Sequence, residues 1–229
     1  MHVQVIVNAE PTAVRDDDGP LTRWFSRYDL ADHLARPASA CAVWLTGQNT
    51  LRHSTLSPEE SAVLDDLEDR GYATVRCGFP YNAAAVDPPF RKEHWLPAAV
   101  RCMQQYLAAG HSPSFAAVVA RHLQPVLDAT RDHLLLLVGS CGARMLGAAM
   151  PFLRVPEGLA LHVVALGPVG TLPELPGQPD PLVVRGRWDV LSVTLSRGPG
   201  VRVDCGHLGY LRCPEARARI LTHAERALR

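Results

Sequence analysis

The chain has 229 residues, of which 47% are hydrophobic and 20% charged, so it is long enough to bury most of its apolar surface in one compact domain. Its 23 Lys and Arg residues balance its 23 Asp and Glu residues, which argues against nucleic acid or an anionic membrane as a partner. The spacing of the six cysteines suggests no disulfide pattern, and there is no Cys-x-x-Cys motif. We interpret them as reduced thiols of a cytosolic protein.

The first residues alternate between apolar and polar side chains from Val3 to Asn8, which predicts a strand. This segment lacks the charged leader and the small-residue cleavage site of a signal peptide, and no apolar run approaches the length of a membrane span. The acidic run Asp16 to Asp18 is interpreted as a solvated turn. The ten histidines form no His-Glu-x-x-His pattern, and no Gly-rich cofactor loop follows a strand, so we expect neither a metal nor a cofactor.

Strands and helices then alternate to the end of the chain. Strands are predicted at residues 40–45, 72–77, 134–138, 161–166, 181–184 and 201–203, and helices at residues 57–70, 91–109, 114–130 and 214–228. The first helix has Ser57 as its N-cap and Pro58 at its first position. This alternation predicts an α/β protein, a three-layer sandwich with a mostly parallel central sheet.

We expect a single domain over residues 1–229, without an inserted lid domain. The stretch from Gly167 to Asp180 is rich in Pro and Gly and has no room for one. Residues 88–131 form a helical segment that is longer than a simple connection requires, and they are a candidate cover for the active site. Ordinary packing against the sheet is the alternative.

The most informative motif is Gly139-Ser140-Cys141-Gly142-Ala143, directly after the apolar run Leu134 to Val138. It is typical of a nucleophile on a tight turn between a strand and a helix, where small residues are needed two positions before and after the nucleophile. Centred on Cys141, the motif places Gly139 and Ala143 at those positions. Centred on Ser140, it places the branched Val138 there, so we expect Cys141 to be the nucleophile.

Two later segments supply a carboxylate and an imidazole at the ends of predicted strands. Gly186-Arg187-Trp188-Asp189 ends the strand at 181–184, and Gly206-His207-Leu208-Gly209-Tyr210 follows the strand at 201–203. The order of nucleophile, acid and base matches one known triad topology. Asp204 is the rival acid, because it lies closer to His207 in sequence.

In these three motifs the sequence resembles the α/β-hydrolase superfamily, and the resemblance extends over nearly the whole chain. It is most similar to small, lidless members with a Cys nucleophile, either dienelactone-hydrolase-like or thioesterase-like. Two features depart from the usual pattern, since Cys141 stands where most members have Ser, and Ala143 and Arg144 replace the paired glycines. The resemblance implies an α/β-hydrolase fold and a catalytic triad of Cys141, His207 and Asp189.

The expected chemistry is acyl transfer or hydrolysis through an acyl-enzyme. His207 activates the thiol, Asp189 orients the imidazole, and the backbone N–H groups of Gly142 and Gln48 stabilise the oxyanion. Side chains beside strand ends and on the predicted helix at 91–109 are candidates for substrate binding. These are Asn49, Phe79, Tyr81, Trp95, Tyr106 and Trp188.

A Cys nucleophile favours a thioester, lactone or activated ester. The substrate is expected to be a small acyl compound, and linkage to a carrier protein stays open. Two other readings also stay open: a non-hydrolytic cyclase, condensing or C–C-cleaving enzyme that excludes water from the same triad, and a binding protein that keeps the fold without catalysis.

Overall fold

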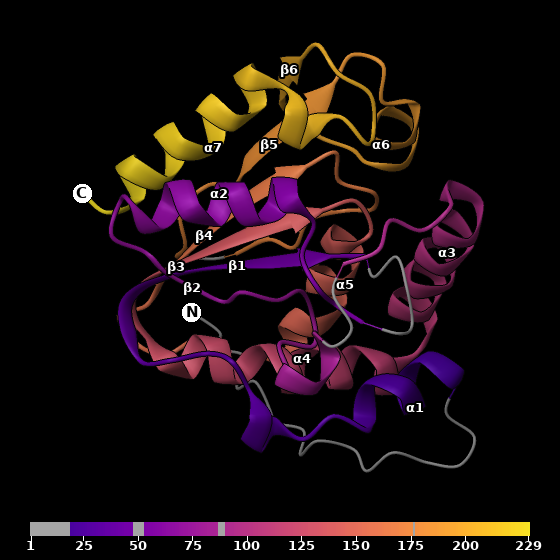
Figure 1. Ribbon diagram of the computed structural model, residues 1–229, viewed down its shortest axis with the longest axis vertical. Helices are drawn as coiled ribbons and strands as arrows, with labels where there is room; N and C mark the ends of the chain where they lie inside the picture. The colour runs from indigo at the N-terminus through magenta and orange to yellow at the C-terminus, as the bar shows by residue number, and fades with distance from the viewer. Residues whose placement is uncertain (1–18, 48–52, 87–89, 176) are drawn as a thin grey trace, which may run out of the picture.

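A computed structural model describes residues 19–47, 53–86, 90–175 and 177–229 of the chain. Its centre is a six-stranded, entirely parallel sheet in the order β2-β1-β3-β4-β5-β6 (Figure 1). The strands are β1 (Ala38–Thr46), β2 (Ala73–Thr74), β3 (Thr130–Gly139), β4 (Ala160–Leu166), β5 (Leu182–Gly186) and β6 (Val201–Val203). The predicted three-layer α/β class is confirmed.

The central strands are apolar on both faces because each face is covered by helices. Alternate residues of β1 and β3 therefore enter two separate cores. Val43, Leu45 and Leu136 belong to one core, whereas Trp44 and Leu137 belong to the other. This explains why Leu134 to Val138 is a continuous apolar run rather than an alternating one.

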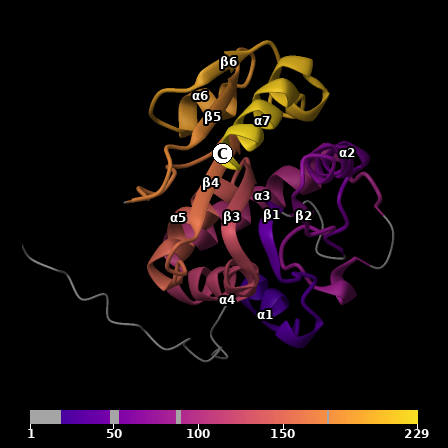
Figure 2. The same cartoon turned by 90° about the vertical axis from the view of Figure 1, so that its left-hand side faces the viewer.

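Helices α1 (Pro20–Ser26), α4 (Pro113–Ala129) and α5 (Gly142–Ala149) cover the first face, and α2 (Pro58–Glu68) and α7 (Pro214–Ala227) cover the second (Figures 1 and 2). The long helix α3 (Trp95–His111) packs beside α5 and α4. The short helix α6 (Val190–Leu195) follows β5. The predicted Ser57 cap of α2 is confirmed and forms a full capping box with Glu60.

Three features differ from the sequence prediction. The strand expected at residues 72–77 is reduced to the two residues of β2, and helices α1 and α6 were not predicted. Both helices are only six or seven residues long, too short for a periodic pattern to reveal them. The strand expected from Val3 to Asn8 lies outside the described residues.

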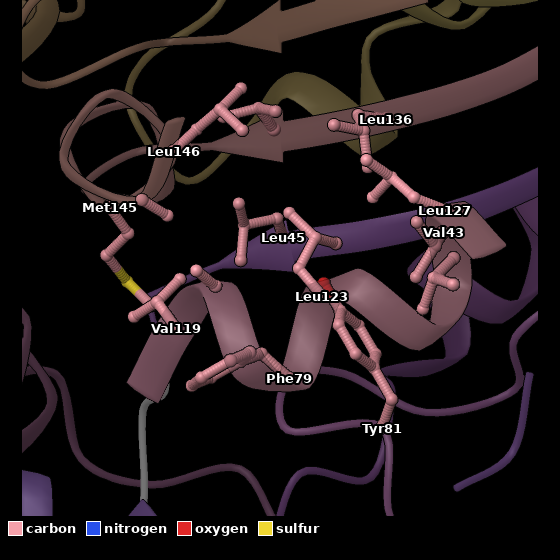
Figure 3. Close-up of a cluster of buried hydrophobic side chains, with 14 of the residues drawn as sticks. Val43, Leu45, Phe79, Tyr81, Val119, Leu123, Leu127, Leu136, Met145 and Leu146 are labelled. Carbon is pink, nitrogen blue, oxygen red and sulfur yellow. The ribbon is translucent and has the colours of Figure 1, made fainter. Parts of the chain in front are cut away.

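Phe79 and Tyr81, expected near substrate, are core residues. Both side chains are buried, and their rings lie 5.8 Å apart. Figure 3 shows them with Leu123 and Val119 of α4, in the cluster that covers the first face of the sheet. The chain after β2 passes under α4 instead of staying at the sheet's edge, so neither ring is available to a ligand.

Candidate active site

The turn between β3 and α5 carries the strained residue of the site. Ser140 follows the last residue of β3 and has φ +50°, a conformation that L-residues rarely adopt. Cys141 is the N-cap of α5, and Gly142 is its first residue. A Cβ on Gly142 would lie 2.0 Å from the carbonyl oxygen of Leu45, so only glycine allows α5 to start this close to β1. This strand, turn and helix have the geometry in which a nucleophile elbow holds its residue.

The partly exposed Ser140 side chain heads a chain of hydrogen bonds. Its Oγ lies 2.9 Å from Nε2 of His207. Nδ1 of the same ring lies 2.9 Å and 3.0 Å from the two carboxylate oxygens of Asp189. The three residues come from the ends of β3, β5 and β6, which meet at one edge of the sheet. They form a serine, histidine and carboxylate constellation with the geometry of a catalytic triad.

The structure does not bring Cys141, the expected nucleophile, to His207. Its side chain is only 2% exposed and belongs to the core. A hydrogen bond to Cys102, together with burial, raises the pKa of the Cys141 thiol well above its ordinary value. A thiol in this position is held protonated, which is the opposite of what a nucleophile needs. The elbow is therefore centred one residue earlier than expected.

Val138, the branched residue that was expected to exclude Ser140 from the elbow, is completely buried in the core and is accommodated two positions before Ser140. The small residue that the turn requires is Gly142, two positions after Ser140. The glycine is visible in the sequence, but the contact with Leu45 that requires it is not.

Asp189 is fully buried and accepts four hydrogen bonds. Besides the two contacts with His207, it accepts from the backbone N–H of Ser192 at 2.9 Å and from the hydroxyl of Tyr210 at 2.6 Å. Burial by itself would raise the pKa of the Asp189 carboxyl group, but these hydrogen bonds together hold the pKa below its ordinary value. The carboxylate is therefore charged and fixed in orientation.

Tyr210 is a positioning residue that the sequence analysis did not identify, although it ends the motif around His207. Its hydroxyl donates to Asp189 and accepts from the N–H of Gly186, at 2.6 Å in each case. Gly167 makes room for this pair. It has φ +52°, and a Cβ there would lie 2.5 Å from the Tyr210 ring and 2.6 Å from the Asp189 carboxylate.

Buried Arg185 fixes the segment after Asp189. Its guanidinium donates to the carbonyl oxygens of Ser192, Ser196 and Arg197, and to the hydroxyl of Ser196. These carbonyls lie at the end of α6, where a cation is favoured by the helix dipole. The guanidinium therefore holds α6 in place, with Asp189 as its N-cap.

The rival acid Asp204 is exposed and accepts a hydrogen bond from the indole N–H of Trp188 at 2.8 Å. It therefore pairs with Trp188, while Asp189 pairs with His207. Trp188 itself is 73% exposed and directly precedes Asp189, so it stands at the rim of the site.

Because the elbow is centred on Ser140 and not on Cys141, the expected oxyanion donor also moves by one residue. The N–H that follows the nucleophile position is that of Cys141 rather than that of Gly142, and it lies at the amino end of α5, where backbone N–H groups are not used within the helix. Gln48, the second expected donor, and Asn49 lie outside the described residues.

The remaining candidates for substrate binding lie on α3. Trp95 is 65% exposed at the start of the helix. Tyr106 is half-buried, with the guanidinium of Arg144 5.2 Å from its ring centre, so it links α3 to α5. Both helices of the segment 88–131 contact α5; α4 belongs to the core, whereas α3 carries exposed side chains.

Two groups of exposed apolar side chains lie on elements near this site. On α3 they follow a helical spacing, namely Leu96, Val100, Met103 and Leu107. Beside Asp189 and His207 they are Trp188, Val190, Leu191 and Leu208. Figure 1 shows α3 and α6 at the same edge of the sheet as the start of α5. Both groups of side chains are therefore exposed on elements that lie at the sheet edge where Ser140 stands.

Within the described ranges, no group of three or more His, Cys, Asp or Glu side chains is arranged to hold a metal ion. In the same ranges, no helix has both the length and the hydropathy to cross a bilayer.

No family model matches the sequence, and no curated protein matches it. Among solved structures, the chain is similar to a dienelactone hydrolase-like promiscuous phosphotriesterase from metagenomic libraries. The two are 16% identical, the match covers 85% of this chain and 86% of that chain, and the TM-score is 0.48. Likeness at this level assigns no activity, so the chemistry has to come from the geometry of the site.

Proposed function

We propose that this protein is a hydrolase that cleaves an ester or thioester of an apolar acyl group through Ser140, His207 and Asp189. The observation that carries the proposal is the continuous chain of hydrogen bonds from Ser140 Oγ through His207 to Asp189, headed by a serine at φ +50°. Backbone strain of this kind costs of order 1–3 kcal/mol and persists mainly where function needs it.

In the first half-reaction, Ser140 Oγ attacks the carbonyl carbon of the substrate while His207 Nε2 takes the hydroxyl proton. Asp189 stabilises the imidazolium that forms, and the N–H of Cys141 donates to the developing oxyanion. His207 then returns the proton to the leaving alcohol or thiol. Water attacks the acyl-serine by the same steps in the second half-reaction and releases the acid.

A serine nucleophile removes the reason for preferring thioesters that a cysteine nucleophile supplied. Oxygen esters are now equally suitable substrates, and the acyl group is selected by the apolar side chains of α3 and of the Trp188 and Leu208 rim. The partial exposure of Ser140 also favours hydrolysis over cyclisation or condensation, since those reactions need water to be kept from the acyl-enzyme.

The test is hydrolysis of p-nitrophenyl esters and the corresponding thioesters with acetyl, butyryl and octanoyl groups. Wild-type protein is expected to hydrolyse the octanoyl compounds with the highest kcat/KM, and a carrier-linked octanoyl thioester is included to test for a protein-bound substrate. Absence of turnover for every ester and thioester would refute the proposal.

A variant on α3 tests the acyl surface. Met103→Ser is expected to lower kcat/KM for octanoyl esters more than for acetyl esters, because about 25 cal/mol is lost for each Å² of apolar contact removed. Phe152→Ser is the matched control, since Phe152 is also an exposed apolar residue but follows the far end of α5. An unchanged octanoyl-to-acetyl ratio in Met103→Ser would place the acyl group elsewhere.

A further inference from the structure

Two thiols lie side by side directly behind the elbow. Cys102 is on α3, and Cys141 is the residue after Ser140. A Cβ placed on Gly47, at the end of β1, would lie 2.3 Å from Sγ of Cys141 and 3.1 Å from Sγ of Cys102. The two sulfur atoms therefore border the same small space, and a hydrogen bond joins them. Neither cysteine is in a disulfide.

The two thiols differ in reactivity. Cys141 is buried, whereas Cys102 is partly exposed. The hydrogen bond from Cys141 and the nearby charges of His207 and Arg101 outweigh partial burial and lower the pKa of Cys102. The same hydrogen bond and complete burial raise the pKa of Cys141. A lowered pKa, partial exposure and a second cysteine beside it are what the peroxide-reactive member of such a pair requires, and Cys102 has all three.

We propose that Cys102 and Cys141 form a disulfide when a hydroperoxide oxidises them, and that this disulfide inactivates the Ser140 site. The regulatory part of the proposal rests on the hydrolase function proposed above. In the first step the Cys102 thiolate attacks one peroxide oxygen, and the other oxygen leaves as hydroxide and takes up a proton. In the second step the thiol of Cys141 gives its proton to the oxygen of the Cys102 sulfenic acid as its sulfur attacks the sulfur of Cys102, and that oxygen leaves as water. Two thiols and one hydrogen peroxide thus give one disulfide and two waters.

The disulfide acts on catalysis through the backbone of the elbow. Sulfur atoms in a disulfide are about 2 Å apart, so the bond ties Cys141 to α3 more closely than the hydrogen bond does. Cys141 follows Ser140 and carries the N–H assigned to the oxyanion. Small displacements of a donor or nucleophile reduce turnover strongly, because both must be held within about 0.5 Å of their working positions. The oxidised protein is therefore expected to be inactive.

The experiment treats reduced full-length protein with hydrogen peroxide and follows it by intact mass, peptide mapping and ester hydrolysis. Wild type is expected to lose two hydrogen atoms, to yield a peptide pair joined through Cys102 and Cys141, and to lose at least tenfold in kcat/KM, with full recovery after dithiothreitol. Cys102→Ser is expected to keep the activity of reduced wild type and to be insensitive to peroxide.

Cys213→Ser is the matched control, because Cys213 hydrogen-bonds to another cysteine, Cys205, away from α3. It is expected to respond to peroxide like wild type. Ser140→Ala is expected to form the same disulfide although it does not hydrolyse ester, so disulfide formation is scored independently of the proposed function.

Three results would overturn the proposal. The first is a peroxide-treated protein in which Cys102 and Cys141 are not joined. The second is a joined pair with unchanged hydrolysis. The third is a Cys102→Ser variant that is inactivated as fast as wild type.

Discussion

Histidines lie near both the carboxyl and the amino ends of the parallel strands, and the two groups differ in the hydrogen bonds of their ring nitrogens. At the carboxyl edge, both nitrogens of His207 have partners, Ser140 on one side and Asp189 on the other. Towards the amino edge, the ring of His162 lies 5.7 Å from the ring of His133 and 6.1 Å from the ring of His223. One nitrogen of each is buried without a hydrogen-bond partner among the described residues.

This difference distinguishes a chemically competent histidine from a packed one. Burial and the neighbouring rings lower the pKa of His162 to about 4, so the ring is neutral and inert near neutral pH. His207 instead has a fixed orientation, a carboxylate on one nitrogen and a hydroxyl on the other. Only such a ring can accept and return a proton.

The largest expected effect separates the two residues of the elbow. Under the proposed function, Ser140→Ala is expected to lower kcat by about 10⁴- to 10⁶-fold, as loss of the nucleophile does in serine proteases. Cys141→Ala keeps the serine and the backbone N–H, and it is expected to retain activity within about tenfold of wild type. Ester hydrolysis by both purified variants, with circular dichroism to verify folding, measures the difference. If Cys141→Ala is the inactive variant, the assignment of the elbow is reversed.

The next largest effect concerns the acid. Asp189→Asn is expected to lower kcat by about 10⁴-fold, because His207 loses the partner that fixes its tautomer. Asp204→Asn is the matched control, an exposed carboxylate that pairs with Trp188, and it is expected to stay close to wild type. Steady-state kinetics on one ester is sufficient. Equal losses in the two variants would contradict the assignment of a single acid.

The histidines at the amino edge are expected to affect stability rather than activity. The pKa of His162 is about 4 in the folded protein, below the ordinary value of 6.5. Its contribution to the free energy of unfolding is therefore complete above pH 6.5 and is lost as the pH falls towards 4. This loss amounts to up to about 3 kcal/mol. The free energy of unfolding, measured in urea, is expected to differ less between pH 7.5 and pH 4.5 for His162→Gln than for wild type.

The matched control for that measurement is His111→Gln, since His111 is exposed at the end of α3. It is expected to show the pH dependence of wild type. An unchanged pH dependence in His162→Gln would mean that other buried groups, such as His122, account for the acid sensitivity.

The smallest expected effect is that of Tyr210, which acts on the triad through Asp189. Tyr210→Phe leaves two hydrogen bonds unmade, and kcat is expected to fall about tenfold, which corresponds to ~1.4 kcal/mol. KM for the ester should stay unchanged, because Tyr210 does not touch substrate. A loss as large as that of Asp189→Asn would mean that Tyr210 takes part in the reaction itself.

Most of the fold could be predicted from the sequence because the apolar runs are long. Leu134 to Val138 is continuous, and the segment of β4 is interrupted only by His162, which identifies strands buried on both faces. The short elements could not be predicted in the same way. Tyr81 illustrates the limit, because local sequence does not reveal that the chain after β2 turns under α4.

The proximity of two of the three hydrogen-bonded site residues could be predicted from the sequence. His207 and Asp189 follow strands that end at one edge, so their proximity follows from parallel topology. The choice between Ser140 and Cys141 depends on which side chain points out of the turn. That is decided by the φ of +50° at Ser140 and by the contact of Gly142 with β1, and both are properties of the packed structure.

The most direct test of the account is the site of covalent modification by a fluorophosphonate, which reacts with serine nucleophiles activated by a histidine. Wild-type protein should carry a single adduct, located on Ser140 by peptide mass mapping, and His207→Ala should react far more slowly. An adduct on Cys141, or modification of Ser140 at the same rate without His207, would contradict the central claim that Ser140 is the nucleophile of this site.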